Sequence, residues 1–281
     1  MFSKAATKKY LTLAAVLGIS LLSLQASTLE DVQSLMPSAG IQKADFHFIR
    51  FSGKKPRAVL VLCPGQNGDG GEYLSDERWK EFARKNDLVI LVPDFESPDK
   101  LLVSGGGYFV AANGSGDLLL QALRKENLSD VPLLFFGFSG GAHFTISFAA
   151  WSPKRLLGFC AYSFAWWSYP PANLKCPAVI ACGELDGKRY ESTFAYFQAG
   201  RRQGNPWTWV SLKKQTHSRS EPLELFVREY FQSLMDCLPQ EQIVVDNIRK
   251  NLLNSSQCNP LTTSILPCSR VLPFWQTIHA P

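Results

Sequence analysis

Ser139 is the residue whose surroundings most clearly indicate chemistry. It stands in Gly137-Phe138-Ser139-Gly140-Gly141, between an apolar run at residues 133–136 and a helical pattern at 139–150. A sharp turn from a buried strand into a helix exposes a serine hydroxyl, and small neighbouring residues leave room for that turn. The start of the helix also favours negative charge. The pattern predicts a nucleophilic serine, and a glycine-rich turn in some other α/β protein is the alternative.

A serine hydroxyl needs a neighbouring base to become a strong nucleophile, and His217 is the preferred candidate among the four histidines. It lies in a polar loop between an expected strand at residues 207–212 and an expected helix at 221–234. In an alternating strand–helix chain this loop is expected to lie above the serine.

The other three histidines are expected to have structural roles. His47 fits a half-exposed position in a strand, and His279 is expected to be peripheral. His143 lies one turn after Ser139 on the same helix, so its side chain does not easily reach back over the hydroxyl. We therefore expect His143 to pack or to form hydrogen bonds within the helix.

Asp186 is the expected partner of His217. It follows a buried strand expected at residues 178–182, in the loop Gly183-Glu184-Leu185-Asp186-Gly187. A carboxylate there would hold the imidazole in one tautomer and stabilise its protonated form. The chain order serine, aspartate, histidine is typical of this serine turn. Glu184 is the rival acid, and a turn-forming aspartate is the structural alternative.

Two backbone N–H groups are expected to stabilise the oxyanion that attack by the serine creates. One belongs to Gly140, directly after the serine, and the other is expected from Gln66. Gln66 lies in the glycine-rich loop 63–71, where Asn67 is the next candidate. The cysteines and histidines show no spacing typical of a metal site, so neither a metal nor an organic cofactor is expected.

Apolar runs alternate with helical patterns along the chain, which predicts a mainly parallel sheet covered by helices on both faces. Residues 27–238 are expected to form this catalytic domain, and residues 239–281 an extension on its surface without a strand partner. The strands are expected at 46–51, 58–62, 88–92, 133–136, 156–161, 178–182 and 207–212, and the helices at 74–85, 115–125, 139–150, 190–202 and 221–234.

Residues 1–26 are predicted to be a signal peptide that directs the chain to secretion or to the periplasm. A basic start at Lys4, Lys8 and Lys9 precedes an apolar run at residues 10–24, and Ala26 offers a small residue for cleavage. The run is shorter than the roughly 20 residues that span a bilayer, so no stable membrane insertion is expected after cleavage. A retained membrane anchor is the alternative.

Charge and cysteine content narrow the class of protein. The chain has 281 residues and a formal net charge of +5, of which residues 1–26 supply three lysines and no acid. Without a clustered basic face, a nucleic-acid partner is not expected. Of the seven cysteines, Cys63, Cys160 and Cys182 lie in apolar runs and fit core positions, whereas those in the tail are better disulfide candidates. The tail cysteines are Cys237, Cys258 and Cys268.

Residues 46–234 resemble the α/β-hydrolase superfamily through the turn at Ser139, the Gly-Glu-Leu-Asp loop at Asp186, and His217 before the last helix. Within it the chain looks most like secreted esterases of the dienelactone hydrolase, feruloyl esterase and polyhydroxybutyrate depolymerase type. Many of these carry His-Gly where this chain has Pro64-Gly65. The resemblance implies an α/β-hydrolase fold without a large cap domain, and hydrolysis of carboxylic esters through an acyl-enzyme.

The segment between the strands at 156–161 and 178–182 is short and rich in aromatic residues. Trp166, Trp167 and Tyr169 are expected to bind a small-molecule or polymer-linked ester, and simple packing is the alternative. A peptidase or amidase with the same triad is a second hypothesis. A secreted, non-catalytic binding protein on a hydrolase scaffold is a third, and the sequence indicates no oligomeric state.

Overall fold

The computed structural model describes residues 28–37, 40–165, 168–172, 174–253 and 259–280. Its centre is an eight-stranded sheet in the order β1-β2-β4-β3-β5-β6-β7-β8, in which all neighbours from β4 to β8 are parallel. β1 and β2 add to one edge in antiparallel pairs. The mainly parallel sheet predicted from the sequence is confirmed.

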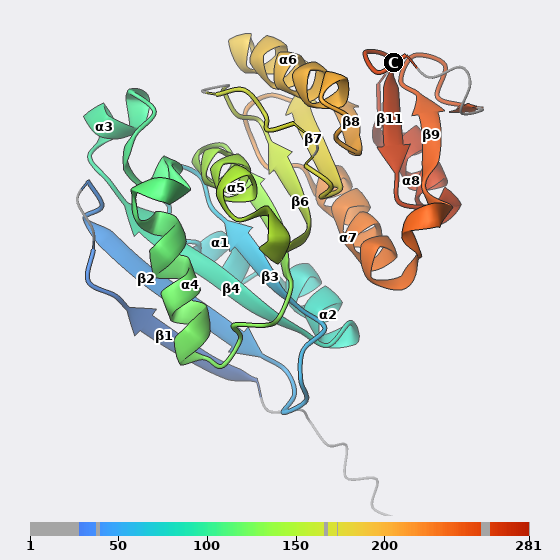
Figure 1. Ribbon diagram of the computed structural model, residues 1–281. Helices are drawn as coiled ribbons and strands as arrows, with labels where there is room; N and C mark the ends of the chain where they lie inside the picture. Colours follow the sequence, from blue (N-terminus) through green and yellow to red (C-terminus); the bar gives the residue numbers. More distant parts are fainter. Residues whose placement is uncertain (1–27, 38–39, 166–167, 173, 254–258, 281) are drawn as a thin grey trace, which may run out of the picture.

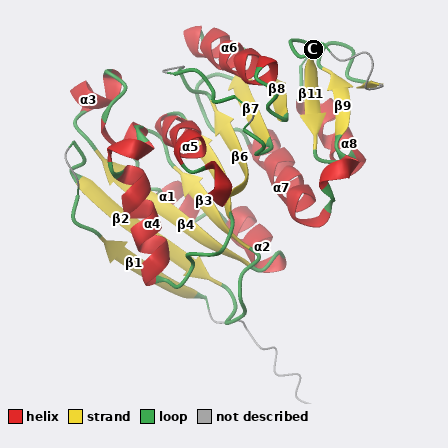
Figure 2. Cartoon of the chain, in the orientation of Figure 1, coloured by secondary structure: helices red, strands yellow, loops and turns green. Residues whose placement is uncertain are grey.

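Helices alternate with these strands along the chain (Figures 1 and 2). The strands of the central sheet are β1 (Leu29–Ser34), β2 (Lys43–Arg50), β3 (Ala58–Cys63), β4 (Leu88–Glu96), β5 (Leu133–Phe138), β6 (Leu156–Tyr162), β7 (Ala178–Gly183) and β8 (Trp207–Leu212). The α-helices between and after them are α1 (Gly71–Leu74), α2 (Glu77–Lys85), α3 (Asp99–Val103), α4 (Ser115–Lys125), α5 (Gly140–Trp151), α6 (Lys188–Arg202) and α7 (Glu221–Asp236). Short 3-10 turns include η1 (Gly107–Phe109), η2 (Ala111–Asn113), η3 (Pro153–Arg155) and η4 (Pro239–Glu241).

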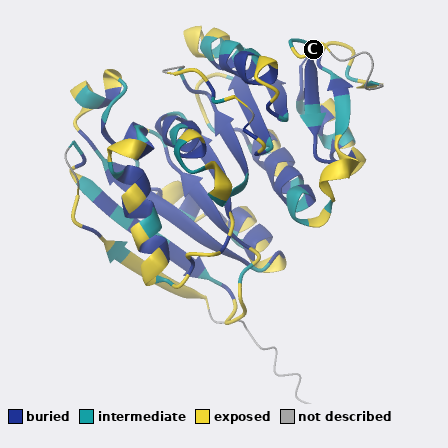
Figure 3. Cartoon of the chain, in the orientation of Figure 1, coloured by how far each residue is buried: buried dark blue, intermediate teal, exposed yellow. Residues whose placement is uncertain are grey.

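Two apolar cores lie on the two faces of the sheet. In β3, Val59 and Val61 belong to the core under α4, α5 and α6, whereas Leu60 and Leu62 belong to the core under α1, α2 and α7. This alternation follows from the two-residue period of a strand. Figure 3 shows the central strands buried and β1 exposed at the edge. The sheet is therefore a fixed platform between two helical layers, which suits it to position groups at the ends of its strands.

The predicted helix at residues 74–85 is wrong in its first turn. The chain forms a short α1, breaks at Ser75 and Asp76, and starts α2 at Glu77. Asp76 accepts a hydrogen bond from the N–H of Arg78 and so caps α2, which ends the continuity of the helix. The other predicted helices agree with the structure within a few residues.

The expectation that residues 239–281 have no strand partner is wrong. β9 (Ile243–Asp246), β10 (Leu252–Leu253) and β11 (Thr263–Leu266) form a second antiparallel sheet, followed by η6 (Ser269–Val271) and α8 (Leu272–Ile278). Ser264 accepts a hydrogen bond from the N–H of Trp209, and Trp275 donates its indole N–H to the carbonyl of the same residue. The segment therefore covers the β8 edge, which would otherwise expose unpaired backbone groups.

His279 is buried rather than peripheral. Its side chain lies next to β8, where Nδ1 accepts a hydrogen bond from the Ser211 N–H at 3.1 Å and Nε2 donates to the Asn247 carbonyl at 2.8 Å. Both ring nitrogens are satisfied only when the imidazole is neutral. Burial lowers the pKa of His279 to about 4, although the Asn247 hydrogen bond opposes this effect.

Of the seven cysteines, Cys63, Cys160 and Cys182 are buried as expected, and Cys258 lies outside the described residues. The sulfur atoms of Cys237 and Cys268 lie 2.7 Å apart, at the end of α7 and just before η6. None of the helices in the described ranges is long and apolar enough to cross a membrane. The predicted signal peptide lies outside those ranges and stays a prediction.

We expect an oxidant such as oxidised glutathione to join Cys237 and Cys268 in a disulfide, taking up the two electrons and two protons that the thiols release. Because the residues are 31 positions apart, the link should raise the free energy of unfolding by about 4 kcal/mol. Urea unfolding and peptide mapping before and after oxidation check this. A Cys237→Ser variant should show no gain, and an equal gain in that variant would contradict the pairing.

We expect acid to destabilise the fold partly through His279. Unfolded, this residue takes up a proton near its ordinary pKa of 6.5, whereas folded it stays neutral down to about pH 4. Its contribution is thus complete above pH 6.5 and is lost as the pH falls toward 4, by at most about 3 kcal/mol. Urea unfolding at pH 7.5 and 4.5 should show a smaller loss for His279→Gln. Equal losses in both proteins would contradict this account.

Candidate active site

The turn between β5 and α5 holds Ser139 in a backbone conformation that few residues adopt. Its φ is 52° and its ψ −114°, outside the regions that non-glycine residues usually occupy. The flanking glycines make this possible. A Cβ at Gly137 would collide with the Gly141 carbonyl and with Thr145, and a Cβ at Gly141 would collide with the Cys63 carbonyl. The packing therefore requires both glycines and presents the serine at the carboxyl end of the sheet.

Ser139, His217 and Asp186 form one hydrogen-bonded chain. His217 Nε2 lies 2.9 Å from Ser139 Oγ, and His217 Nδ1 lies 2.8 Å from Asp186 Oδ2. The Asp186 side chain is 2% exposed, and an ionised carboxylate can only accept hydrogen bonds. Nδ1 therefore carries the proton of the neutral ring, which leaves Nε2 free to accept the serine proton. The Phe138 ring, 5.0 Å from the imidazole, packs against it.

Two adjacent loops bring the aspartate and the histidine together at the ends of β7 and β8. A Cβ at Gly183 would collide with the Gln215 backbone, so the two loops come this close only because residue 183 is glycine. The Leu185 N–H donates to the Gln215 carbonyl at 2.9 Å and locks the loops to each other. Glu184, the rival acid, instead accepts the Lys214 N–H at 3.2 Å. Of the two acids, only Asp186 meets the imidazole.

Arg219, two residues after His217, anchors the histidine loop. Its guanidinium donates to both carboxylate oxygens of Glu224 at 2.7 Å and to Asp76 Oδ2 at 3.0 Å, and it lies over the Tyr73 ring. Burial would raise the pKa of Asp76, but hydrogen bonds from Arg78 and Arg219 outweigh it and lower the pKa to about 2. This network ties the loop to α7 and to the start of α2.

A second contact holds the same loop from the side of the sheet. Tyr162, the last residue of β6, donates its hydroxyl to the Ser218 carbonyl at 2.7 Å. The Gln215 side chain donates to the hydroxyl of the same serine at 2.7 Å. His217 is therefore held between fixed points on both sides, which limits how far its ring can move from Ser139.

The backbone of Gln66 lies directly against Gly140. A Cβ at Gly140 would come within 2.6 Å of the Gln66 nitrogen. Within the described residues, neither N–H group donates a hydrogen bond, so both are available beside the serine. Asn67, the other candidate donor, gives its N–H to the Tyr108 hydroxyl at 3.0 Å. The arrangement therefore favours Gln66 over Asn67 as the partner of Gly140 in holding an oxyanion.

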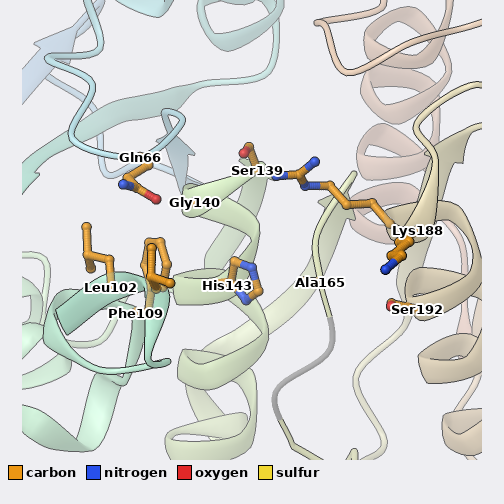
Figure 4. A pocket seen from close by; sticks show the side chains of 11 residues that line it. Gln66, Leu102, Phe109, Ser139, Gly140, His143, Ala165, Lys188 and Ser192 are labelled. Carbon is orange, nitrogen blue, oxygen red and sulfur yellow. The ribbon is translucent and has the colours of Figure 1, made fainter. Parts of the chain in front are cut away.

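A pocket of about 370 Å³ opens beside the serine (Figure 4). One wall is apolar and comes from the α3 and η1 region, whereas the opposite wall comes from the start of α6. The lining residues are Gln66, Leu102, Val103, Phe109, Ser139, Gly140, His143, Ala165, Lys188, Arg189 and Ser192. Concave sites of this kind, with an apolar wall and a few polar groups, are typical of small-molecule binding sites.

His143 lies in the wall of this pocket and packs there, as expected from its place on the helix. Its ring stacks on Phe109, with the centroids 4.9 Å apart. Burial lowers the pKa of His143 to about 3, and the positive charge of Arg189 adds to this effect. The ring is therefore neutral at ordinary pH, and it is His217 that reaches the serine hydroxyl.

The aromatic residues expected to bind substrate are only partly placed. Trp166 and Trp167 lie outside the described residues, and Tyr169 is 72% exposed and does not line the pocket. Sequence reasoning missed the contributions of α3 and of Lys188 and Arg189. The sequence did contain a signal for Lys188 and Arg189, because they follow directly after the Asp186 loop. A helix that starts beside the aspartate also starts close to the serine, so its first residues can line the pocket.

No model of a known protein family matches this chain, and no curated protein matches its sequence. Solved structures do match it. S-formylglutathione hydrolase from Staphylococcus aureus aligns with a TM-score of 0.56 and 12% identity, over 75% of this chain and 98% of that one. Dienelactone hydrolase from Anabaena variabilis aligns with a TM-score of 0.53 and 16% identity, over 73% of this chain and 97% of that one. Poly(3-hydroxybutyrate) depolymerase from Bordetella parapertussis aligns with a TM-score of 0.52 and 15% identity, over 82% of this chain and 94% of that one.

These similarities show that the chain has the α/β-hydrolase fold, as the sequence predicted. Dienelactone hydrolase and poly(3-hydroxybutyrate) depolymerase are two of the three enzyme types that the sequence resembles. At such low identity the likeness concerns the fold, so the chemistry has to be argued from the residues of this chain.

We expect Arg219→Met to slow the reaction of Ser139 with a fluorophosphonate probe by roughly a hundredfold, because an error of about 1 Å in the base can cost this much. The matched control is Arg57→Met, which removes an exposed ion pair with Asp236 far from the site. Second-order labelling rates and circular dichroism of both folded variants check this. Parent-like labelling of a folded Arg219→Met protein would show that the network does not position His217.

Proposed function

We propose that this protein is a serine hydrolase that cleaves carboxylic esters through an acyl-enzyme. The observation that carries the proposal is the hydrogen-bonded chain from Ser139 through His217 to Asp186 beside a pocket. The backbone of Gln66 lies against Gly140, directly after the serine, and the N–H groups of both residues are available. A nucleophile, a base, an orienting acid and an oxyanion site are the four parts that acyl transfer needs.

In the first half of the reaction, Ser139 Oγ attacks the ester carbonyl carbon while its proton passes to His217 Nε2. The carbonyl oxygen becomes an oxyanion and accepts hydrogen bonds from the N–H groups of Gln66 and Gly140. Asp186 stabilises the imidazolium that forms. The tetrahedral intermediate collapses when His217 gives its proton to the leaving alcohol, and the acyl group stays on the serine.

In the second half, water enters where the alcohol was, and His217 takes one of its protons. The hydroxide adds to the acyl carbon, and the oxyanion forms again at the same two N–H groups. Collapse returns the proton from His217 to Ser139 Oγ and releases the carboxylic acid. The chain itself supplies every group in this cycle, so the proposal includes no metal or organic cofactor.

A small-molecule or polymer-linked ester fits the site better than a peptide. The pocket beside Ser139 is about 370 Å³, which holds a small acyl or alcohol group, and the described residues form no cap over it. An amidase with the same triad is the second candidate on chemical grounds, since the same four parts also cleave amides. We further propose export of the chain, on the strength of the signal-like segment 1–26.

The proposal predicts that Ser139→Ala and His217→Ala each lower kcat/KM for 4-nitrophenyl acetate by about a thousandfold or more. Purified protein would be assayed beside His47→Ala, which removes a half-exposed histidine from β2. The corresponding amide, 4-nitroacetanilide, would be assayed in parallel, so that kcat/KM for amide cleavage can be compared with kcat/KM for ester cleavage. Activity that survives Ser139→Ala, or parent protein that neither hydrolyses esters nor reacts with a fluorophosphonate, would overturn the proposal in favour of a binding protein.

A further inference from the structure

The pocket beside Ser139 has two chemically different walls. Leu102, Val103 and Phe109 form an apolar side, whereas Lys188 and Arg189 bring two positive charges from the first turn of α6. Figure 4 shows Lys188 on the α6 side of the pocket, with Leu102 and Phe109 on the other side. An ester with only alkyl groups would use the first wall and make no charged contact with the second.

The cation of Lys188 is exposed and uncommitted. Residue 188 is exposed, and within the described residues its ammonium group makes no ion pair and no hydrogen bond. A long flexible side chain with three N–H donors can adjust to a negatively charged group that enters the pocket. Lys188 therefore has the freedom that a ligand contact needs, and no structural role competes with it.

Arg189 is held close to the reacting groups but keeps most of its donors. Its guanidinium lies 3.8 Å from Asp186 Oδ1, while the other oxygen of that carboxylate is bonded to His217. Within the described chain, the Arg189 side chain donates no hydrogen bond at normal distance. The planar fork of a guanidinium suits a carboxylate, which accepts two parallel hydrogen bonds from it.

The pocket contains no opposing negative charge among its described lining residues. Asp186 lies behind the wall, with its side chain 2% exposed and bonded to His217. Asp99, near the opposite side, accepts hydrogen bonds from the side chains of Gln66 and Asn67. The positive potential of Lys188 and Arg189 is therefore directed at whatever occupies the pocket.

We propose that the substrate is an ester carrying a free carboxylate, which Lys188 and Arg189 bind while the apolar wall holds its hydrocarbon part. This inference rests on the proposed serine esterase activity and names its substrate class. With the scissile carbonyl at Ser139, the carboxylate would lie on the α6 side of the pocket. Half-esters of short dicarboxylic acids and esters of hydroxy acids have this form.

The test compares each carboxylate substrate with its neutral methyl ester. On the acyl side the pair is mono(4-nitrophenyl) adipate and methyl 4-nitrophenyl adipate. On the alcohol side it is 4-acetoxybenzoate and methyl 4-acetoxybenzoate. The quantity measured is the ratio of kcat/KM for carboxylate to kcat/KM for methyl ester at low salt. We expect at least one pair to give a ratio of roughly ten or more, and a lower ratio at high salt.

The variants are Lys188→Gln and Arg189→Gln, each of which should lower that ratio by about five- to tenfold. A ratio is used because a change at Arg189 also touches Asp186 and so affects both substrates of a pair. Arg202→Gln, at the exposed end of the same helix, makes the same change in net charge and should leave both rates at the parent value. Lys188→Glu should bring the ratio below one.

The outcomes separate the two proposals. If the neutral esters are hydrolysed through Ser139 but the ratio is near one in both pairs, the carboxylate proposal is wrong and the esterase proposal stands. A high ratio that persists in Lys188→Gln and Arg189→Gln also overturns it, since other residues would then bind the anion. If no ester of either kind is hydrolysed, the esterase proposal itself fails.

Discussion

The contact between the β3 loop and the first turn of α5 is the constraint on which the site depends. Gly140 and Gly141 let the backbone of Cys63, Pro64 and Gln66 approach the helix without side chains between them. This contact places the Gln66 N–H beside the Gly140 N–H and keeps Ser139 in its unusual backbone conformation. Any side chain on either glycine would push the loop, and with it the Gln66 N–H, away from Ser139.

Around this fixed point, the flexible groups are restrained by neighbours rather than by their own backbone. His217 sits on a loop, yet Arg219, Tyr162 and Gln215 hold that loop from different sides. On the pocket wall the side chains are held less: Lys188 is exposed, and Arg189 has only a 3.8 Å contact with Asp186. The structure thus combines closely held side chains around Ser139 with more adaptable side chains on the pocket wall.

Much of the fold, and the contacts that join Ser139, His217 and Asp186, could be predicted from local pattern. Buried parallel strands appear as continuous apolar runs, and the glycines around Ser139 mark a turn that tolerates little else. The loop carrying Asp186 and the loop carrying His217 were found because each follows such a run.

The failures concern residues whose role depends on distant partners. The small sheet after η4 has short strands with weak patterns, and it packs against the distant β8 through Ser264 and Trp209. The burial of His279 depends on Ser211 and Asn247, which are far away in the sequence. The anchor at Arg219 depends on Asp76 and Tyr73, more than a hundred positions earlier. Such contacts depend on how distant elements pack, so no local sequence pattern predicts them.

The cover over β8 also orders events during synthesis. Ser211 in β8 is bonded to His279, and the two are 68 positions apart. A growing chain on the ribosome therefore presents β8, with its unpaired edge, well before the residues that cover it are made. β8 leads to the loop that carries His217, and the edge of β8 is covered only after translation has passed His279. A protein with this arrangement therefore completes the support of the loop that carries His217 late in its synthesis.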